Sequence, residues 1–292
     1  MTTPELFVGI TSWNSELFLP HCLEALQSTT RGVDTHVCVL DNGSTDRSAA
    51  IASERGAEVV QRRCSQPDAL NALLNRSRSP YTLLLHADVI LLAPDWFQLC
   101  RSRFSEGVAL VSPQDIGCGP LTRPFGAGMP ESSFLLMHTR RFRRCLRLHW
   151  RRKGRLPRPR YEVDFQGPHI THHLPRELQR QKLGWVPMDV YVSNRASEPL
   201  FTPASPPAIW SDELAYLRYG LGNFYGLDGT ITHYHNWYDR MITPRPAGTE
   251  APRRQFPAAF INSYSQRFLA DLQADRVDLP RDLRTDRQPV AL

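Results

Sequence analysis

The stretch "LLLHADVILL" (Leu83–Leu92) places a carboxylate in the most apolar part of the chain. Asp88 has apolar residues on both sides, and His86 lies two positions before it. A carboxylate in such surroundings is costly unless a metal ion or a cationic side chain balances its charge. Asp88 therefore marks either a metal site or a buried ion pair with an arginine, and the rest of the sequence has to decide between them.

The segments around this stretch alternate between strand-like and helix-like patterns. The strand-like segments are apolar with little alternation, which is typical of strands buried on both faces, and the helix-like segments carry apolar residues at helical spacing. Strands are expected over 5–13, from Thr35 into the polar turn 41–46, over 57–62 and over 81–92, with helices over 19–30, 47–57 and 66–77. This order predicts an α/β fold with a doubly wound, mostly parallel central sheet flanked by helices.

The second half of the chain is less regular. A strand is expected within 131–142, and a later helix is expected to stop at Gly184 and to lead into another strand. Further helices are expected over 211–226 and, with an amphipathic pattern, near 255–273. The pattern therefore predicts a C-terminal extension of helical and irregular structure.

Three polar groups follow the predicted strands: Thr11–Asn14, Asp41–Asp46 and His86–Asp88. In open α/β sheets, ligands bind beyond the carboxyl ends of the strands. "DNGSTD" (Asp41–Asp46) taken alone is equally well a turn that caps a helix. The convergence of three such groups predicts one ligand-binding crevice, in which Mg²⁺ or Mn²⁺ would link Asp88 to a diphosphate.

These motifs resemble the GT-A glycosyltransferases, in particular the large family 2 of nucleotide-sugar-dependent enzymes. The resemblance covers roughly residues 5–195, and its carriers are "VGITSWNSELFLPHCLEAL", "VCVLDNGSTDRSAAIA", "DALNALLNRSRSPYTLLLHADVILLAPDW" and "LQRQKLGWVPMDVYV". It implies a GT-A catalytic domain over 1–195 with a basic insertion over 140–160. An acceptor-side extension over 196–243 and a C-terminal helix and tail over 244–292 would follow.

The resemblance also implies roles for individual residues. Asp88 matches the last acid of the family's D-x-D motif, which holds Mg²⁺ or Mn²⁺ on the diphosphate. His86 replaces the first acid, and it either contacts the diphosphate or the ion, or is only a neutral replacement. The residues expected to bind the nucleotide-diphospho-sugar are Thr11, Trp13, Asn14, Asp41, Asn42, Asn71, His86 and Ala87.

The catalytic base departs from the family pattern. Inverting members carry an acidic E-D pair before a helix that ends in Gly-Trp, but "PHITHHLPREL" stands at that place. His172 and His173 lie nearest to the missing pair, and an imidazole can serve as a general base near neutral pH. The alternative role of this pair is structural or acceptor-binding, and Glu177 is a spare carboxylate expected to face outward.

A late histidine often supplies a further metal or phosphate ligand in the family. "GTITHYHNWYDR" (Gly229–Arg240) offers His233 and His235, which would share one side of a strand. The alternative is that this segment forms the edge of an aromatic core. Asp212 and Glu213 are reserve candidates for the acceptor site, although helix capping explains them equally well.

The net charge of +6 is concentrated in the segment 140–160, which holds ten arginines and one lysine and no acid. Without these eleven charges the net charge would be −5. With Phe142, Cys145 and Trp150 among the arginines, the segment is typical of an interfacial helix that contacts an anionic membrane or a lipid-linked acceptor. A solvated loop without a partner is the alternative, and nucleic acid is the less favoured partner because no recognition motif accompanies the charge.

The sequence thus predicts a glycosyltransferase of the hexosyltransferase type. It would move a sugar from a nucleotide-diphospho-sugar, with UDP favoured, to a hydroxyl of a glycan or glycolipid acceptor, in an inverting and metal-dependent reaction. No signal peptide opens the chain and no apolar run reaches the roughly 20 residues that span a bilayer. A cytoplasmic protein, in peripheral contact with the inner membrane face through the basic segment, is expected. The alternative is a non-catalytic nucleotide-sugar-binding relative, or a protein that binds membranes or nucleic acid through the same segment.

Overall fold

The structure is a computed structural model, and it describes residues 3–114, 130–145, 147–150, 159–162, 171, 174–192, 219, 222–236 and 258–279. The chain divides into two compact units. Unit 1 comprises residues 1–115 and 128–188, and unit 2 comprises 116–127 and 189–292. The domain boundaries expected near 195 and 243 lie outside the described residues and stay a prediction.

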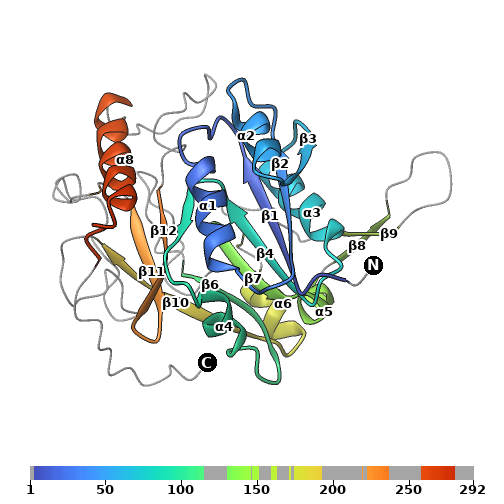
Figure 1. Cartoon of the computed structure of the whole chain (residues 1–292). Helices are drawn as coiled ribbons and strands as arrows, with labels where there is room; N and C mark the ends of the chain where they lie inside the picture. Colours follow the sequence, from blue (N-terminus) through green and yellow to red (C-terminus); the bar gives the residue numbers. More distant parts are fainter. Residues whose placement is uncertain are drawn as a thin grey trace, which may run out of the picture. The chain divides into compact units, whose positions relative to one another are not determined.

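Unit 1 is built on a central β-sheet (Figure 1). The strands β2, β1 and β4 run parallel to one another, β3 runs parallel to β2, and β10 runs parallel to β6, while β7 is antiparallel to its neighbours β4 and β6. In sheet order the strands are β3 (Glu58–Gln61), β2 (Thr35–Asp41), β1 (Leu6–Ser12), β4 (Tyr81–His86), β7 (Phe134–His138), β6 (Val108–Pro113) and β10 (Gly184–Val192). The predicted mostly parallel α/β sheet is confirmed.

The helices of unit 1 follow the expected pattern in the first half of the chain. In sequence order they are α1 (Leu19–Thr29), α2 (Ser48–Glu54), α3 (Gln66–Arg76), α4 (Trp96–Arg101), α5 (Thr139–Phe142) and α6 (Leu174–Arg180). Helix α3 begins where the Ser65 hydroxyl accepts the Asp68 backbone N–H at 3.3 Å, which satisfies one of the donors that a helix leaves at its start. Helix α2 ends before Gly56, whose positive φ suits glycine.

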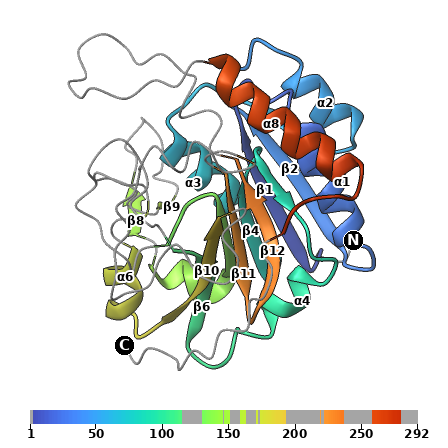
Figure 2. The same cartoon turned by 90° about the vertical axis from the view of Figure 1, so that its left-hand side faces the viewer.

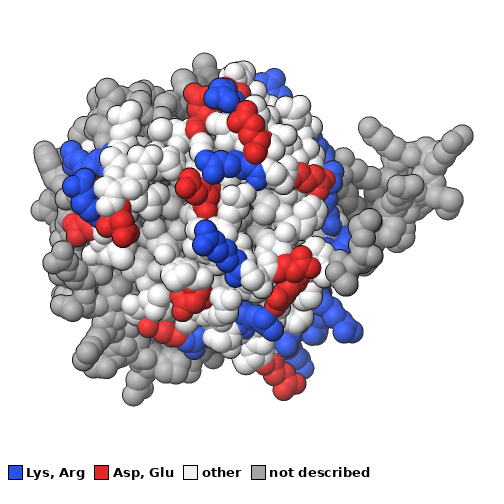
Figure 3. All heavy atoms as spheres, viewed as in Figure 1, with Lys and Arg blue, Asp and Glu red and all other residues white. Residues whose placement is uncertain are grey.

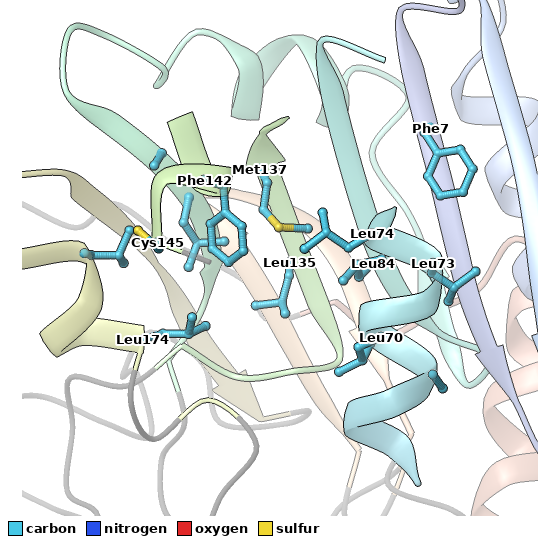
Figure 4. Close-up of a cluster of buried hydrophobic side chains, with 14 of the residues drawn as sticks. Phe7, Leu70, Leu73, Leu74, Leu84, Leu135, Met137, Phe142, Cys145 and Leu174 are labelled. Carbon is cyan, nitrogen blue, oxygen red and sulfur yellow. The ribbon is translucent and has the colours of Figure 1, made fainter. Parts of the chain in front are cut away.

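The main core of unit 1 lies between α3 and the sheet. Figure 4 shows Leu70, Leu73 and Leu74 of α3 beside Leu84 of β4 and Leu135 of β7. All of these side chains are at most 1% exposed. Burial of such a leucine contributes about 1.5–3 kcal/mol, so this layer holds the helix on the strands that end at the polar groups.

Three sequence expectations need correction. The single strand expected over 81–92 is two strands, β4 and β5 (Val89–Leu91), because the chain turns at Ala87–Asp88. Strand β6 and helix α4 were not expected, since short apolar segments do not distinguish buried strands from helices. The helix expected over 211–226 is wrong at its end, where β11 (Asn223–Leu227) begins.

The interfacial helix expected in the basic segment is also wrong. Helix α5 ends at Phe142, and a 3₁₀ helix (Arg143–Cys145) and two antiparallel strands, β8 (Arg147–Trp150) and β9 (Pro159–Glu162), take the place of the expected helix. Phe142 and Cys145 belong to the hydrophobic core. These two side chains are therefore not available to a membrane-facing surface.

Three arginines of this segment bind backbone carbonyl groups of unit 1. Arg141 Nη1 donates to the carbonyl oxygens of Ser105 at 2.6 Å and Val108 at 2.8 Å, and Arg144 Nη2 donates to Gln181 at 3.2 Å. Arg143 Nη2 donates to Leu74 O at 3.1 Å and to Ser77 O at 2.7 Å, at the end of α3, where a helix leaves carbonyl groups without an intrahelical donor. Part of the basic charge therefore serves the fold.

The surface away from the basic segment mixes both signs of charge. Figure 3 shows one face on which the described acidic and basic side chains are interspersed. Arg76 contacts Glu58 at 2.6 Å, and Arg101 contacts Glu5 at 2.6 Å. Exposed pairs of this kind contribute about 0–1 kcal/mol each, so they balance charge locally and stabilise little.

Unit 2 contains the last residues of β10, from Asp189 to Val192, in an antiparallel arrangement with β11 and β12 (Thr230–His235), seen side by side in Figure 2, and helix α8 (Ala258–Gln273). Phe268 of α8 stacks on Tyr234 with ring centroids 3.7 Å apart, and it meets Tyr219 edge-on at 5.2 Å. The Tyr219 hydroxyl donates to Asp271 Oδ2 at 2.9 Å. This aromatic core confirms the predicted amphipathic helix in the tail. Within the described residues, helices long and apolar enough to cross a membrane are absent.

Gly9 on β1 has no room for a side chain, because a Cβ there would lie 2.8 Å from Leu73 Cβ. We expect Gly9→Ala to lower the free energy of unfolding by about 1–3 kcal/mol through overpacking. The matched control is Gly184→Ala, whose Cβ would meet only ordinary contacts, the nearest at 3.6 Å. Urea denaturation of both variants measures the difference, and equal stabilities would contradict the close packing of α3 on β1.

Candidate active site

The three polar groups predicted from the sequence meet at one edge of the unit 1 sheet. In the parallel ladders, Ser12 of β1 is level with Asp41 of β2, and Thr11 is level with His86 of β4. The Ala87 N–H donates to Thr11 O at 3.1 Å, and the Asn42 N–H donates to Ser12 O at 2.8 Å. The carboxyl ends of three neighbouring strands are therefore joined by backbone hydrogen bonds.

Side chains tie the first two of these groups together. The Ser44 hydroxyl donates to Asp41 Oδ1 and accepts the Asn14 N–H at 2.9 Å, while the Ser44 N–H donates to Asp41 Oδ2 at 3.2 Å. Asn14 Oδ1 in turn accepts the Thr45 N–H at 2.8 Å. Asn14 has φ 48°, a left-handed conformation that asparagine tolerates better than most residues. The two loops are thus held in one conformation.

The residues predicted to bind the donor differ in how exposed their side chains are and in which polar atoms are already hydrogen-bonded. Asp41 is only 1% exposed, whereas the ring of Trp13 is 37% exposed, which is unusual for so large a side chain. Asn42 Oδ1 accepts the Cys64 N–H at 2.7 Å, so this oxygen holds the chain after β3. The buried Ser12 hydroxyl has no hydrogen-bond partner among the described residues. The edge thus offers an accessible aromatic ring and an unused hydroxyl.

Asn71 and Ala87, two further residues expected to bind the donor, are both buried. Asn71 is buried on α3 and is 5% exposed, and Ala87 is 3% exposed in the turn that separates β4 from β5. The position of these two residues beside a nucleotide-sugar stays a prediction. The small side chain of Ala87 leaves the backbone of the turn close to the Thr11 carbonyl.

His86 and Asp88 come together at the end of β4. Each offers a ligand atom within 4.8 Å of the other, and Asp88 is 9% exposed. Burial, and then the nearby charge of Asp88, raises the pKa of the Cys22 thiol, so this thiol stays protonated. A carboxylate and an imidazole suit Mn²⁺, and Mg²⁺ needs few protein ligands, so the pair fits the predicted ion.

The side chain of Gln66 on α3 forms a hydrogen bond with the His86 imidazole. The amide Nε2 lies 2.7 Å from His86 Nε2, and because an amide nitrogen only donates, this contact needs an unprotonated Nε2. If the amide turned by 180°, its oxygen would accept from Nε2–H, and Nδ1 would keep its lone pair for a metal. Such an outer partner that sets the tautomer is common for metal-binding histidines.

The family model for glycosyl transferase family 2 matches residues 7–162, which is more than half of the chain. The chain belongs to glycosyl transferase family 2. The resemblance stated from the sequence and the expected α/β fold are thereby confirmed. A search of the curated proteins gave no significant match.

Solved structures similar to this family 2 chain include a synthase and a mannosyltransferase. Glucosyl-3-phosphoglycerate synthase from Mycobacterium tuberculosis in complex with phosphoglyceric acid is 18% identical, with a TM-score of 0.41 over 49% of this chain and 60% of that chain. A mannosyltransferase from Pyrobaculum calidifontis in complex with GDP-Man and Mn²⁺ is 13% identical, with a TM-score of 0.45 over 64% of this chain and 55% of that chain.

The family's late metal histidine has two candidates on β12 of unit 2. His233 is fully buried, stacks on Tyr225 with ring centroids 4.9 Å apart, and has Nδ1 3.0 Å from Thr232 Oγ1. Burial, and then the neighbouring His235, holds the pKa of His233 well below its usual range, so its imidazole is neutral. This is the form that binds metals, and the aromatic stacking equally suits the alternative of an aromatic core.

The residues that match the family's acidic pair, His172 and His173, lie outside the described residues, as do Asp212 and Glu213. Their described neighbour Thr171 lies three residues before α6, and its carbonyl accepts the N–H of Leu174, the first residue of the helix, at 2.9 Å. Glu177 is only 7% exposed, and Arg180 contacts its carboxylate at 2.8 Å. The expectation that Glu177 faces outward is therefore wrong.

The sequence analysis missed a buried polar run, Glu131–Ser133, which directly precedes β7. Glu131 is 1% exposed, and the Ser133 hydroxyl donates to its Oε2. The Ser133 carbonyl accepts the His86 N–H at 2.9 Å, so this run borders the end of β4. An acid followed by two serines gives no sequence signal, because loops that precede strands commonly have this composition.

Ser44 joins Asp41 to Asn14, so its loss should loosen the edge of the sheet. We expect Ser44→Ala to lower the free energy of unfolding by about 1–2 kcal/mol, because the carboxylate of Asp41 loses a donor. The control is Ser28→Ala on the exposed side of α1, where the hydroxyl bonds only to Ala25 O. Thermal or urea unfolding of the pair is the measurement, and a Ser44→Ala variant as stable as the control would disprove the linkage.

Proposed function

We propose that the chain transfers a sugar from a nucleotide-diphospho-sugar, with UDP as the favoured nucleotide, to a hydroxyl of a glycan or glycolipid acceptor. The observation that supports this most is the register of β1, β2 and β4. It brings Trp13 and Asp41 to the same edge as His86 and Asp88. The nucleotide and the diphosphate of one ligand would both bind along that edge.

The nucleotide would bind across the ends of β1 and β2. The exposed ring of Trp13 offers a face for the base, and a carboxylate such as Asp41 can accept hydrogen bonds from the base or ribose. Thr11 and Asn14 flank this place, and Asn71 would face the nucleotide-sugar from α3. The uridine preference rests on family likeness.

The diphosphate would lie at the end of β4, where Asp88, assisted by His86, would hold Mg²⁺ or Mn²⁺. A bound divalent ion supplies stabilisation of the negative charge that builds on the leaving diphosphate. The charge of Asp88 in an apolar stretch is explained in this way, because a carboxylate with a divalent partner is less costly to bury than one without. His235 and His233 stay predicted additional ligands.

Transfer would be a single displacement with inversion at the anomeric carbon, as in family members that carry the E-D pair. The acceptor hydroxyl then needs a base, for which His173 and His172 are the candidates at the position of that pair. The hexosyl nature of the sugar is part of the same proposal. Contact of the arginines in 140–160 with an anionic membrane stays a proposal, although three of them are used within the fold.

A second candidate function is nucleotide-sugar binding without catalysis. Two departures favour it, namely His86 in place of an acid and the absence of an E-D pair before α6. Slow release of free sugar from a nucleotide-sugar in the presence of Mn²⁺ distinguishes the two functions. A donor panel that gives binding but no hydrolysis and no transfer would favour the second.

We expect Asp88→Asn to abolish sugar transfer and to remove the dependence of nucleotide-diphosphate affinity on Mn²⁺, because the amide cannot balance the charge of the ion. Asp95→Asn is the matched control, since Asp95 is exposed seven residues later and makes no side-chain cap. Calorimetric titration of UDP with and without Mn²⁺, together with a transfer assay, gives the answer. Full activity of Asp88→Asn would refute the metal role.

A further inference from the structure

Glu131 is a buried carboxylate without a role in the function proposed above. Its backbone N–H donates to Pro113 O, at the end of β6, at 2.8 Å, and the chain enters β7 at Phe134. Because β7 runs antiparallel to β4 and β6, its start lies at the edge where those strands end. Glu131 therefore lies at the same edge of the sheet as the donor-binding residues.

The distance along this edge suits a base that acts beside a bound donor. Neighbouring strands are about 4.8 Å apart, so β4 lies roughly 10 Å from β2, and β7 lies about 5 Å beyond β4. A nucleotide on the Asp41 side with its diphosphate near Asp88 would place the sugar toward β7. The hydrogen bond from His86 N–H to Ser133 O connects these two positions directly.

Glu131 also lies next to the place where the family carries its acidic pair. The Thr171 hydroxyl donates to Pro130 O, the carbonyl just before Glu131. Thr171 lies three residues before α6, where its carbonyl accepts the Leu174 N–H, and it directly precedes His172. A carboxylate from the connection between β6 and β7 therefore follows directly after a residue that is hydrogen-bonded to Thr171.

The polar neighbours of Glu131 are those of a site that receives a ligand. Burying a carboxylate costs several kcal/mol unless hydrogen bonds or a partner charge compensate it. The Ser133 hydroxyl donates to Oε2, and the fully buried Ser132 hydroxyl has no hydrogen-bond partner among the described residues. An unused buried hydroxyl is costly, and a substrate hydroxyl would satisfy it.

We propose that Glu131 is the general base of the transfer reaction. An oxygen of its carboxylate takes the proton of the acceptor hydroxyl while the acceptor oxygen forms a bond to the anomeric carbon. The bond from that carbon to the diphosphate oxygen breaks, and its electron pair leaves with the nucleoside diphosphate. The carboxylic acid then returns its proton to water. This inference rests on the proposed function, and it gives the role of the base to Glu131 in place of His172 and His173.

The test is Glu131→Gln, because glutamine keeps an oxygen that can accept the Ser133 hydroxyl but cannot take a proton. General bases contribute about 10²–10⁴-fold, so we expect the kcat of transfer to fall at least about 100-fold. The affinity for UDP with Mn²⁺ and the unfolding temperature should stay near those of the wild type. The control is Glu106→Gln, since Glu106 is exposed before β6.

A rescue experiment separates a base from a structural acid. In Glu131→Ala, added formate should restore part of the transfer activity, whereas in Glu131→Gln it should not, because the amide fills the place of the missing carboxylate. If Glu131→Gln shows no cooperative unfolding, and is therefore not folded, Glu131→Asp takes its place in the transfer assay. That variant keeps the carboxylate but withdraws it by about one methylene, and the expected result is a lower kcat with an unchanged affinity for UDP.

Several results would overturn the inference. These are transfer by Glu131→Gln within threefold of the wild type, no formate rescue of a folded Glu131→Ala, or an unchanged kcat in Glu131→Asp. If Glu131→Gln lost both its Mn²⁺-dependent binding of UDP and its transfer activity, Glu131 would only position the end of β4. Wild-type protein that transfers no sugar from any donor would instead refute the proposed function itself.

Discussion

The parallel pairing of β1 with β2 and β4 is the constraint on which the rest of the structure depends. It sets Ser12 level with Asp41 and Thr11 level with His86, so residues from three distant parts of the chain share one edge. Side chains alternate between the faces of a strand, and a slip of one residue would move each of them to the opposite face. The apolar layer of α3 resists such a slip, because Leu73 packs within van der Waals contact of Gly9.

The polar groups at this edge are held in place before any ligand binds. Ser44 holds the carboxylate of Asp41, Gln66 contacts the imidazole of His86, and Ser133 holds the carboxylate of Glu131. Preorganised groups of this kind stabilise developing charge without the free-energy cost of reorienting during the reaction. Besides capping helices, the turn at Asp41–Asp46 thus links the ends of β1 and β2.

The basic segment shows that charge composition alone does not assign a role to each arginine. Ten arginines within 140–160 indicate an anionic partner when they are counted along the sequence. In the fold, Arg141, Arg143 and Arg144 bind carbonyl oxygens from three separate places in unit 1. A guanidinium serves this purpose well because its several N–H donors diverge in one plane. Those acceptors are distant in sequence, so no local pattern reveals them.

The sequence by itself determined the alternation of strands and helices up to Leu92, the parallel sheet and the three polar groups at its edge. Apolar periodicity and turn residues are local properties, and these elements satisfy them without help from distant segments. Only the tertiary structure decided that the strand breaks at Ala87–Asp88, that Glu177 is buried, and that Glu131 lies beside the start of α6. Each of these depends on contacts between segments far apart in the chain, where burial and hydrogen bonding outweigh local preference.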